Sequence, residues 1–241
     1  MRRPRERIDL AIYVRAFAVF ARNPTVIILP FLVAVIGVLV SLTSSAGGLA
    51  ALTGGILSFI VLLLQLFALG VSVIIGDAGW RRGTANFDDA WQDARRKGGD
   101  ILFAAFGFTF VFMIAQYAGT LVGGGIVSLI LAVVAVFGLI YTIPAAAVGG
   151  VPGSAAIGVS IERVRGAPLT AAVLTVVSLV LVFFFGSYVG AWIDGFVADY
   201  TGGSPIVAAL IDGLVRSIAT GYVAIVMAKV YADVSFTMPR W

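Results

Sequence analysis

Two charged side chains interrupt an otherwise apolar stretch near the C-terminus. Asp212 and Arg216 belong to the segment VAALIDGLVRSIATGYVAIVMAKV and are four residues apart. On a helix they share a face and can form an ion pair. Ionisable residues inside a membrane are costly and are candidates for function by default. The pair indicates either a polar site for a substrate, ion or proton, or a helix end where Arg216 reaches the outer headgroups and Asp212 is hydrated. The second arrangement is the favoured one.

Other polar side chains offer less chemistry. Gln65 and Gln116 lie in the middle of apolar runs, where an amide is expected to form hydrogen bonds between helices rather than to contact a ligand. Asp194, Asp199 and Asp212 form an acidic group that could hold a cation, but a solvated loop is the commoner role of such residues. We therefore expect no metal site, and the candidate polar site consists of Asp212, Arg216, Gln65 and Gln116.

The sequence contains no Cys and no His. Disulfides, zinc or haem sites with His or Cys ligands, and Ser-His or Cys-His nucleophiles are excluded. No phosphate-binding loop or dinucleotide fingerprint occurs, and Gly123-Gly124-Gly125 lacks the strand-loop-helix context that phosphate binding requires. We expect no catalytic residues and no cofactor, so the chain is predicted not to be an enzyme.

Composition shows which elements must position these residues. The 241 residues are 61% hydrophobic and 12% charged, about half the charge that a water-soluble domain carries. Runs such as LSFIVLLLQLFALGVSVII are apolar on every face, which indicates membrane-spanning helices rather than strands. Six segments reach the required length of about 20 residues. We place them near 26–42, 56–75, 101–121, 126–148, 169–193 and 206–228.

The basic residues predict the orientation. The connections at 43–55, 122–125 and 194–205 contain no Lys or Arg. The N-terminal region, the segments 77–100 and 149–168 and the C-terminus carry nearly all of them, with Arg216 as the exception. The positive-inside rule then places both termini in the cytoplasm of a multi-pass protein of the plasma or inner membrane. This distribution, without a basic surface bearing stacking aromatics, argues against nucleic acid as a partner.

The charged segments resemble one another. They read IDLAIYVRAFAVFARNPTVIILP, NFDDAWQDARRKGGDILFAAF and GSAAIGVSIERVRGAPLTAAVL. Each predicts a short helix, here termed an elbow helix, then a break at Asn23-Pro24, Gly98-Gly99 or Gly166-Ala167-Pro168, then a spanning helix. The chain is thus one membrane domain, 1–241, of three units (about 8–75, 86–148 and 154–234), each an elbow helix and a helical hairpin. The alternative is that the elbows are plain cytoplasmic linkers.

The second elbow helix has the clearest signals. Asn86 is suited to cap its N-terminus, with acidic residues in the first turn and Arg95 and Arg96 in the last, as the helix dipole favours. An apolar stripe of Phe87, Ala90, Trp91 and Ala94 is expected to face the acyl chains from the membrane interface. In the third elbow, Ser154 is the candidate cap.

Two stretches and the C-terminus resemble a known family. AFAVFARNPTVIILP, YTIPAAAVGGVPGSAAIGVSIERVR and the closing Lys229-Val230-Tyr231-Ala232-Asp233 are similar to the six-span membrane domain found with some bacterial glycerophosphodiester phosphodiesterases, and to related small membrane proteins. The resemblance implies a six-helix fold with elbows, and no catalytic residues to carry over. A chain without His cannot supply the acid-base histidines of the phosphodiesterase module.

These features predict a non-enzymatic membrane protein that acts by contact with lipids, with another membrane protein or with itself. The alternative is a small transporter or channel with a polar site near Asp212 and Arg216.

Overall fold

The computed structural model describes residues 8–43, 49–201 and 205–237. This part of the chain is helical throughout, with short connections and no strand. Among the described residues, three helices are long and apolar enough to cross a membrane, and up to five spans result if each of two bent helix pairs counts as one span. The prediction of an all-α chain with several helices long and apolar enough to span a membrane is confirmed.

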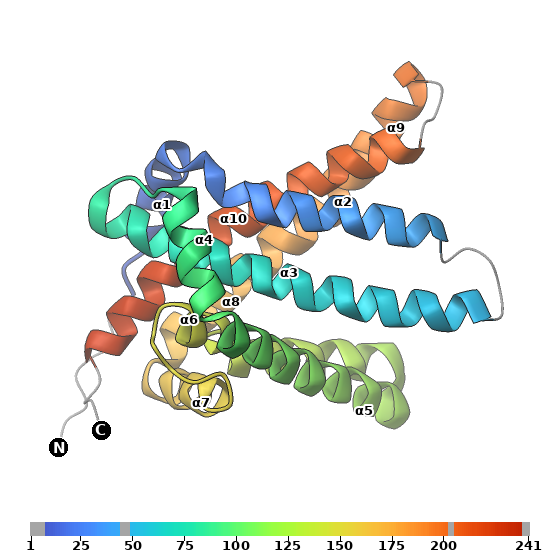
Figure 1. Cartoon of the computed structure of the whole chain (residues 1–241). Helices are drawn as coiled ribbons and strands as arrows, with labels where there is room; N and C mark the ends of the chain where they lie inside the picture. The colour runs from blue at the N-terminus through green and yellow to red at the C-terminus, as the bar shows by residue number, and fades with distance from the viewer. Residues whose placement is uncertain (1–7, 44–48, 202–204, 238–241) are drawn as a thin grey trace.

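The long helices share one arrangement. They run from a common end of the molecule, where the short helices α1, α4 and α7 lie, and diverge toward the opposite end (Figure 1). The short helices are α1 (Ala11–Arg22), α4 (Phe87–Arg96), α6 (Thr142–Ala147) and α7 (Ala156–Gly166). The remaining helical elements, in chain order, are η1 (Pro24–Ile27, a 3₁₀ turn), α2 (Ile28–Thr43), α3 (Leu49–Arg82), α5 (Gly98–Leu139), α8 (Pro168–Leu179), η2 (Val180–Val189, π-helical), α9 (Gly190–Thr201) and α10 (Pro205–Thr237).

Three short helices each lead directly into a longer one. Between α1 and the helix that follows, the chain bends by 93°, and between α7 and α8 by 112°. The residue at each bend, Asn23 (φ −130°, ψ 57°) or Ala167 (φ −138°, ψ 66°), precedes a proline. A proline restricts the residue before it to non-helical conformations, which ends the short helix there. The second elbow, α4, ends at Arg96 without a following proline, and only Lys97 separates it from the start of α5.

The helix α5 is two helices in one continuous run. Gly123 and Gly124 have non-helical backbones, and φ of Gly124 is +70°, which glycine adopts without strain. Beyond this break the chain turns back on itself. A Cβ on Gly119 would collide with the backbone of Ser128, whose hydroxyl donates to the carbonyl of Gln116 at 3.0 Å. The break falls within the connection predicted at 122–125.

Most of the buried core lies near the end that carries α1, α4 and α7, here called the elbow end. Its largest fully buried side chains include Tyr141, Ile75, Ile101, Leu174 and Ile225, which come from five different helices or their connections. Toward the diverging ends, a small cluster of Val33, Val61 and Ala68 joins α2 to α3. The hairpins are therefore held together mainly at the elbow end.

The helices α3 and α10 pack closely against each other in this core. A Cβ on Gly76 would lie 2.9 Å from the Cα of Ile225, so only glycine allows the two backbones to approach this closely. One turn further along α3, the indole Nε1 of Trp80 donates to the carbonyl of Ile225 at 2.8 Å. This bond crosses between helices and fixes their relative height.

The elbow helix α4 differs from the sequence prediction in one respect. Its Asn86 cap is confirmed, since the side chain accepts from the amide of Asp88 at 3.0 Å. However, its apolar stripe packs inward: Ala90 and Ala94 are buried, and the rings of Trp91 and Phe67 meet edge to face at 6.2 Å. The expectation that the stripe faces acyl chains is wrong, because α3 and α5 cover it. The expected Ser154 cap of α7 is also wrong, since Ala155 occupies that position and no side chain caps the helix.

Candidate functional site

The predicted pairing of Asp212 with Arg216 is present in α10. The guanidinium Nε of Arg216 donates to the Asp212 carboxylate at 2.7 Å. The Arg216 side chain is 54% exposed and that of Asp212 is 23% exposed. The carboxylate is therefore turned toward the protein and the guanidinium outward.

Two glycines explain how the carboxylate is enclosed. A Cβ on Gly190 would lie 2.5 Å from Oδ1 of Asp212, so α9 approaches the carboxylate with bare backbone. On the neighbouring residue, a Cβ on Gly213 would lie 3.1 Å from the Cβ of Ala34 in α2. Asp212 thus faces α9 at a point where α10 also packs on α2.

One oxygen of this carboxylate lacks a partner. Oδ1 of Asp212 is buried and accepts no hydrogen bond within the described part of the chain. A buried acceptor without a donor costs free energy, so water, a proton or a cation would stabilise it. Either predicted arrangement would supply such a partner for Oδ1: a bound ion or proton in a polar site, or water at a hydrated helix end.

The two predicted amides lie elsewhere. Gln65 in α3 and Gln116 in α5 are exposed, and no hydrogen bond within the described residues joins either side chain to Asp212 or Arg216. Gln116 contributes its backbone carbonyl instead, which accepts from Thr120 and Ser128. The side chains of Asp194 and Asp199 lie outside the described ones. Among the described residues, no group of three or more His, Cys, Asp or Glu side chains is placed to hold a metal ion.

Sequence reasoning missed the residue that joins the elbows to each other. Asn23 is 2% exposed, and its Nδ2 donates to the carbonyls of Val19 (2.8 Å) and Gly83 (3.2 Å). Its Oδ1 accepts from the amide of Ala85 at 2.6 Å. One amide side chain thus ties the end of α1 to the α3–α4 connection. The available signal was an asparagine directly before the proline that ends the first elbow helix.

The helix α1 presents three different faces. Successive residues of an α-helix are about 100° apart. One face, with Ile12 and Ala16, is buried, and a second, with Leu10, Val14 and Phe17, is apolar and exposed, Val14 to 73%. Arg15 and Arg22 lie between these two faces on a third, also exposed. This is the pattern of a helix that lies in a membrane interface.

A hydrogen bond fixes α1 against α10. The hydroxyl of Tyr222 donates to the backbone carbonyl of Tyr13 at 2.6 Å. Burial, with a smaller contribution from Tyr222, raises the pKa of Tyr13 to about 12. Tyr13 therefore stays neutral through the physiological pH range. The apolar stripe of α1 is thus held in a fixed orientation relative to the core.

Comparison with protein-family models, with curated proteins and with solved structures found no match. The resemblance to the phosphodiesterase-associated membrane domain stays a prediction.

Proposed function

We propose that this chain is a six-span membrane protein with both termini in the cytoplasm, and that it acts without catalysis through contacts of its elbow end with lipids or with another membrane protein. The break at Gly123 and Gly124 supports six spans because it divides α5 into two helices that fold back on each other. In the two bent pairs, the helices that follow the bends, α2 after α1 and α8 after α7, would each begin one further span.

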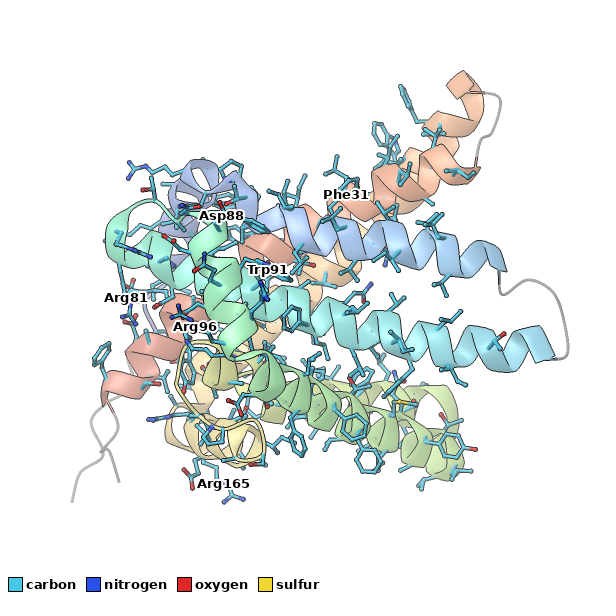
Figure 2. The ribbon with its side chains drawn as sticks, viewed as in Figure 1. Phe31, Arg81, Asp88, Trp91, Arg96 and Arg165 are labelled. Carbon is cyan, nitrogen blue, oxygen red and sulfur yellow. The ribbon has the colours of Figure 1, made fainter. Side chains whose placement is uncertain are left out.

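The charge distribution supports the orientation and the three-unit repeat. Arg81 at the end of α3, Arg96 on α4 and Arg165 on α7 lie at the elbow end, while Phe31 begins the apolar path of α2 (Figure 2). Positively charged residues favour the cytoplasmic side. In the proposed repeat, each elbow helix would precede one helical hairpin.

The observation that carries the proposal is the exposed apolar stripe of α1 beside its two arginines. Leu10, Val14 and Phe17 are suited to the acyl chains, and Arg15 and Arg22 to the phosphates of the same leaflet. Basic residues near an anionic leaflet contribute roughly 1 kcal/mol each. The elbow end would therefore rest in the inner leaflet and present a basic surface to lipids or partners.

Single cysteines test the orientation, since the chain contains none. A cysteine at Gly125, in the α5 turn, should react with a membrane-impermeant maleimide in intact cells. A cysteine at Arg95, on α4, should react only after the cells are broken. Labelling of position 95 in intact cells, or protection of position 125, would contradict the proposed topology.

Adjacent spin labels on α1 test the lipid contact. With the protein in bilayers, a label at Val14 should be accessible to oxygen, which concentrates among acyl chains. A label at the neighbouring Arg15 should be more accessible to a water-soluble nickel complex. If both labels prefer nickel to the same extent, α1 lies away from the membrane and the proposal fails.

The unpaired oxygen of Asp212 favours a second candidate function, transport of a proton or small cation past α9 and α10. Proteoliposomes containing the protein should then show proton or alkali-cation flux, which Asp212→Asn should abolish. A matched control is Asp233→Asn, because Lys229 and Asp233 form an ion pair of the same spacing at the elbow end of α10 (2.7 Å). No flux, or equal flux in both variants, would rule out transport through this pair.

A further inference from the structure

A pocket of about 310 Å³ lies between the end of α3 and the elbow helix α4. The volume is at the lower end of the roughly 300–1,000 Å³ range of small-molecule sites. Its floor is apolar, and its walls are polar. The lining consists of Ile74, Ala78, Arg82, Asn86, Asp89, Ala90, Gln92, Asp93 and Arg96.

The charges in the walls balance. Arg82 and Arg96 supply two guanidinium groups, and Asp89 and Asp93 supply two carboxylates. Asp93 lies 3.5 Å from the ammonium of Lys97, whose Nζ also donates to the carbonyl of Ala147 at 2.9 Å. The side chains of the other three, Arg82, Asp89 and Arg96, take part in no ion pair or hydrogen bond within the described residues.

Unpaired charges of both signs around one pocket select the chemistry of the ligand. Guanidinium groups bind phosphate oxygens with two parallel hydrogen bonds, so the two arginines favour a phosphate ester. A free carboxylate beside them favours a cationic group with N–H donors. No aromatic side chain lines the pocket, so it lacks the cage that recognises quaternary ammonium groups.

We propose that this pocket binds a phosphate ester that carries a primary ammonium group. The phosphate binds Arg82 and Arg96, and the ammonium donates to Asp89, with Asn86 and Gln92 as further polar contacts. Two sources share this chemistry: the headgroup of phosphatidylethanolamine and soluble phosphoethanolamine. The lipid source rests on the proposed position of the elbow end in a leaflet, whereas the soluble source does not.

The position of the pocket is compatible with a headgroup. The pocket lies at the elbow end, where the basic residues of α3 and α4 gather. Its apolar floor, Ile74 and Ala78 of α3 and Ala90 of α4, continues into the buried core. A phosphatidylglycerol headgroup offers no cation to Asp89, and a phosphatidylcholine headgroup offers no N–H donor. Phosphatidylethanolamine satisfies both signs of charge.

The purified full chain allows a direct test. Native mass spectrometry with added phosphatidylethanolamine, phosphatidylcholine and phosphatidylglycerol measures lipid binding, and calorimetry with phosphoethanolamine measures the soluble ligand. We expect phosphatidylethanolamine or phosphoethanolamine to bind at least about tenfold more tightly than the choline counterpart. Equal binding of the ethanolamine, choline and glycerol headgroups, with no binding of phosphoethanolamine, would overturn the proposal.

Neighbouring residues supply matched controls for the arginines. The double variant Arg82→Gln with Arg96→Gln should lose about tenfold or more in affinity. The double variant Arg81→Gln with Arg95→Gln removes the same charge outside the pocket lining and should bind within about twofold of the original chain. Equal losses in both would show a nonspecific effect of charge and would overturn the proposal.

A single carboxylate variant separates recognition from folding. Asp89→Asn should abolish the preference for ethanolamine over choline, whereas Asp88→Asn, outside the lining, should keep it. This readout is a ratio within one protein sample, so a partial loss of folded protein does not change it. Retention of the preference in Asp89→Asn would contradict the assigned role. The phosphoethanolamine arm needs no membrane, so its result is independent of the spin-label test of α1.

Discussion

Replacing Asn23 by Ala should destabilise the fold more than any single exposed polar change at the elbow end. The substitution removes the donor to Gly83 O (3.2 Å) and the acceptor for Ala85 N–H (2.6 Å), which connect α1 to the α3–α4 connection. It also removes the bond to Val19 O. A hydrogen bond contributes about 0.5–1.5 kcal/mol net, and a buried group left unpaired costs about 1–3 kcal/mol. Because Asn23 is 2% exposed, we expect a total loss of about 2–4 kcal/mol.

The near-isosteric change Asn23→Asp separates hydrogen bonding from volume. One carboxylate oxygen can still accept from Ala85, but the other would face the carbonyl oxygens of Val19 and Gly83, to which Nδ2 now donates. The ionised form is therefore disfavoured in the folded state, and the pKa of the introduced carboxyl should rise. A group with a raised pKa stabilises below its unfolded value, so this variant should recover stability as pH falls toward about 4.

Equilibrium unfolding by SDS in mixed micelles measures the free energy, and hydrogen exchange measures the amide of Ala85 directly. The exposed cap variant Asn86→Ala, which loses one bond to Asp88, serves as the control and should cost about 1 kcal/mol. The reasoning is refuted if Asn23→Ala costs no more than Asn86→Ala and exchange at Ala85 is unchanged.

Three further outcomes follow from contacts at the elbow end. Gly76→Ala should cost about 1–3 kcal/mol of stability because its Cβ would meet the backbone of Ile225. The control Gly55→Ala, in the same helix, meets nothing within 4 Å and should be neutral or stabilising. Equal stabilities of the two variants in thermal unfolding would contradict this. Trp80→Phe should cost about 0.5–1.5 kcal/mol through loss of the bond to Ile225, measured by the same unfolding. The stability that Tyr13 contributes should be complete below pH 10 and lost as pH rises toward 12. Absorbance at 295 nm measures this titration, and the component that Tyr13→Phe removes should have its midpoint near 12. A midpoint near 10 would contradict the raised pKa of Tyr13.

Sequence patterns predicted features that depend on neighbours along the chain. The Asn86 cap, the break at Gly123 and Gly124 and the Asp212–Arg216 pair each involve residues within four positions of one another. A helical period, by contrast, shows that a face is apolar but not whether lipid or protein covers it. The stripe of α4 packs on protein, whereas α1 has one apolar face that packs on the core and a second that is exposed.

Features that depend on distant segments could not be predicted in this way. Asn23 bonds to residues about 60 positions away, and nothing in the local sequence marks Gly83 and Ala85 as its partners. The approach of Gly190 to Asp212 depends on how closely α9 packs on α10. The pocket between α3 and α4 likewise depends on the angle at which α4 folds back after Gly83, where φ is +84°.

The contact of Trp80 with Ile225 constrains how the protein is made. The two residues are 145 positions apart, and Tyr13 and Tyr222 are 209 apart. At a synthesis rate of roughly 5–20 residues per second, about 7–30 seconds separate the emergence of Trp80 from that of Ile225. During that interval the indole N–H has no partner from α10, and the surface at Gly76 that Ile225 later covers stays uncovered. The elbow end is therefore completed last, and a ribosome that stalls before α10 leaves a core that lacks Ile225 and the other buried residues of that helix.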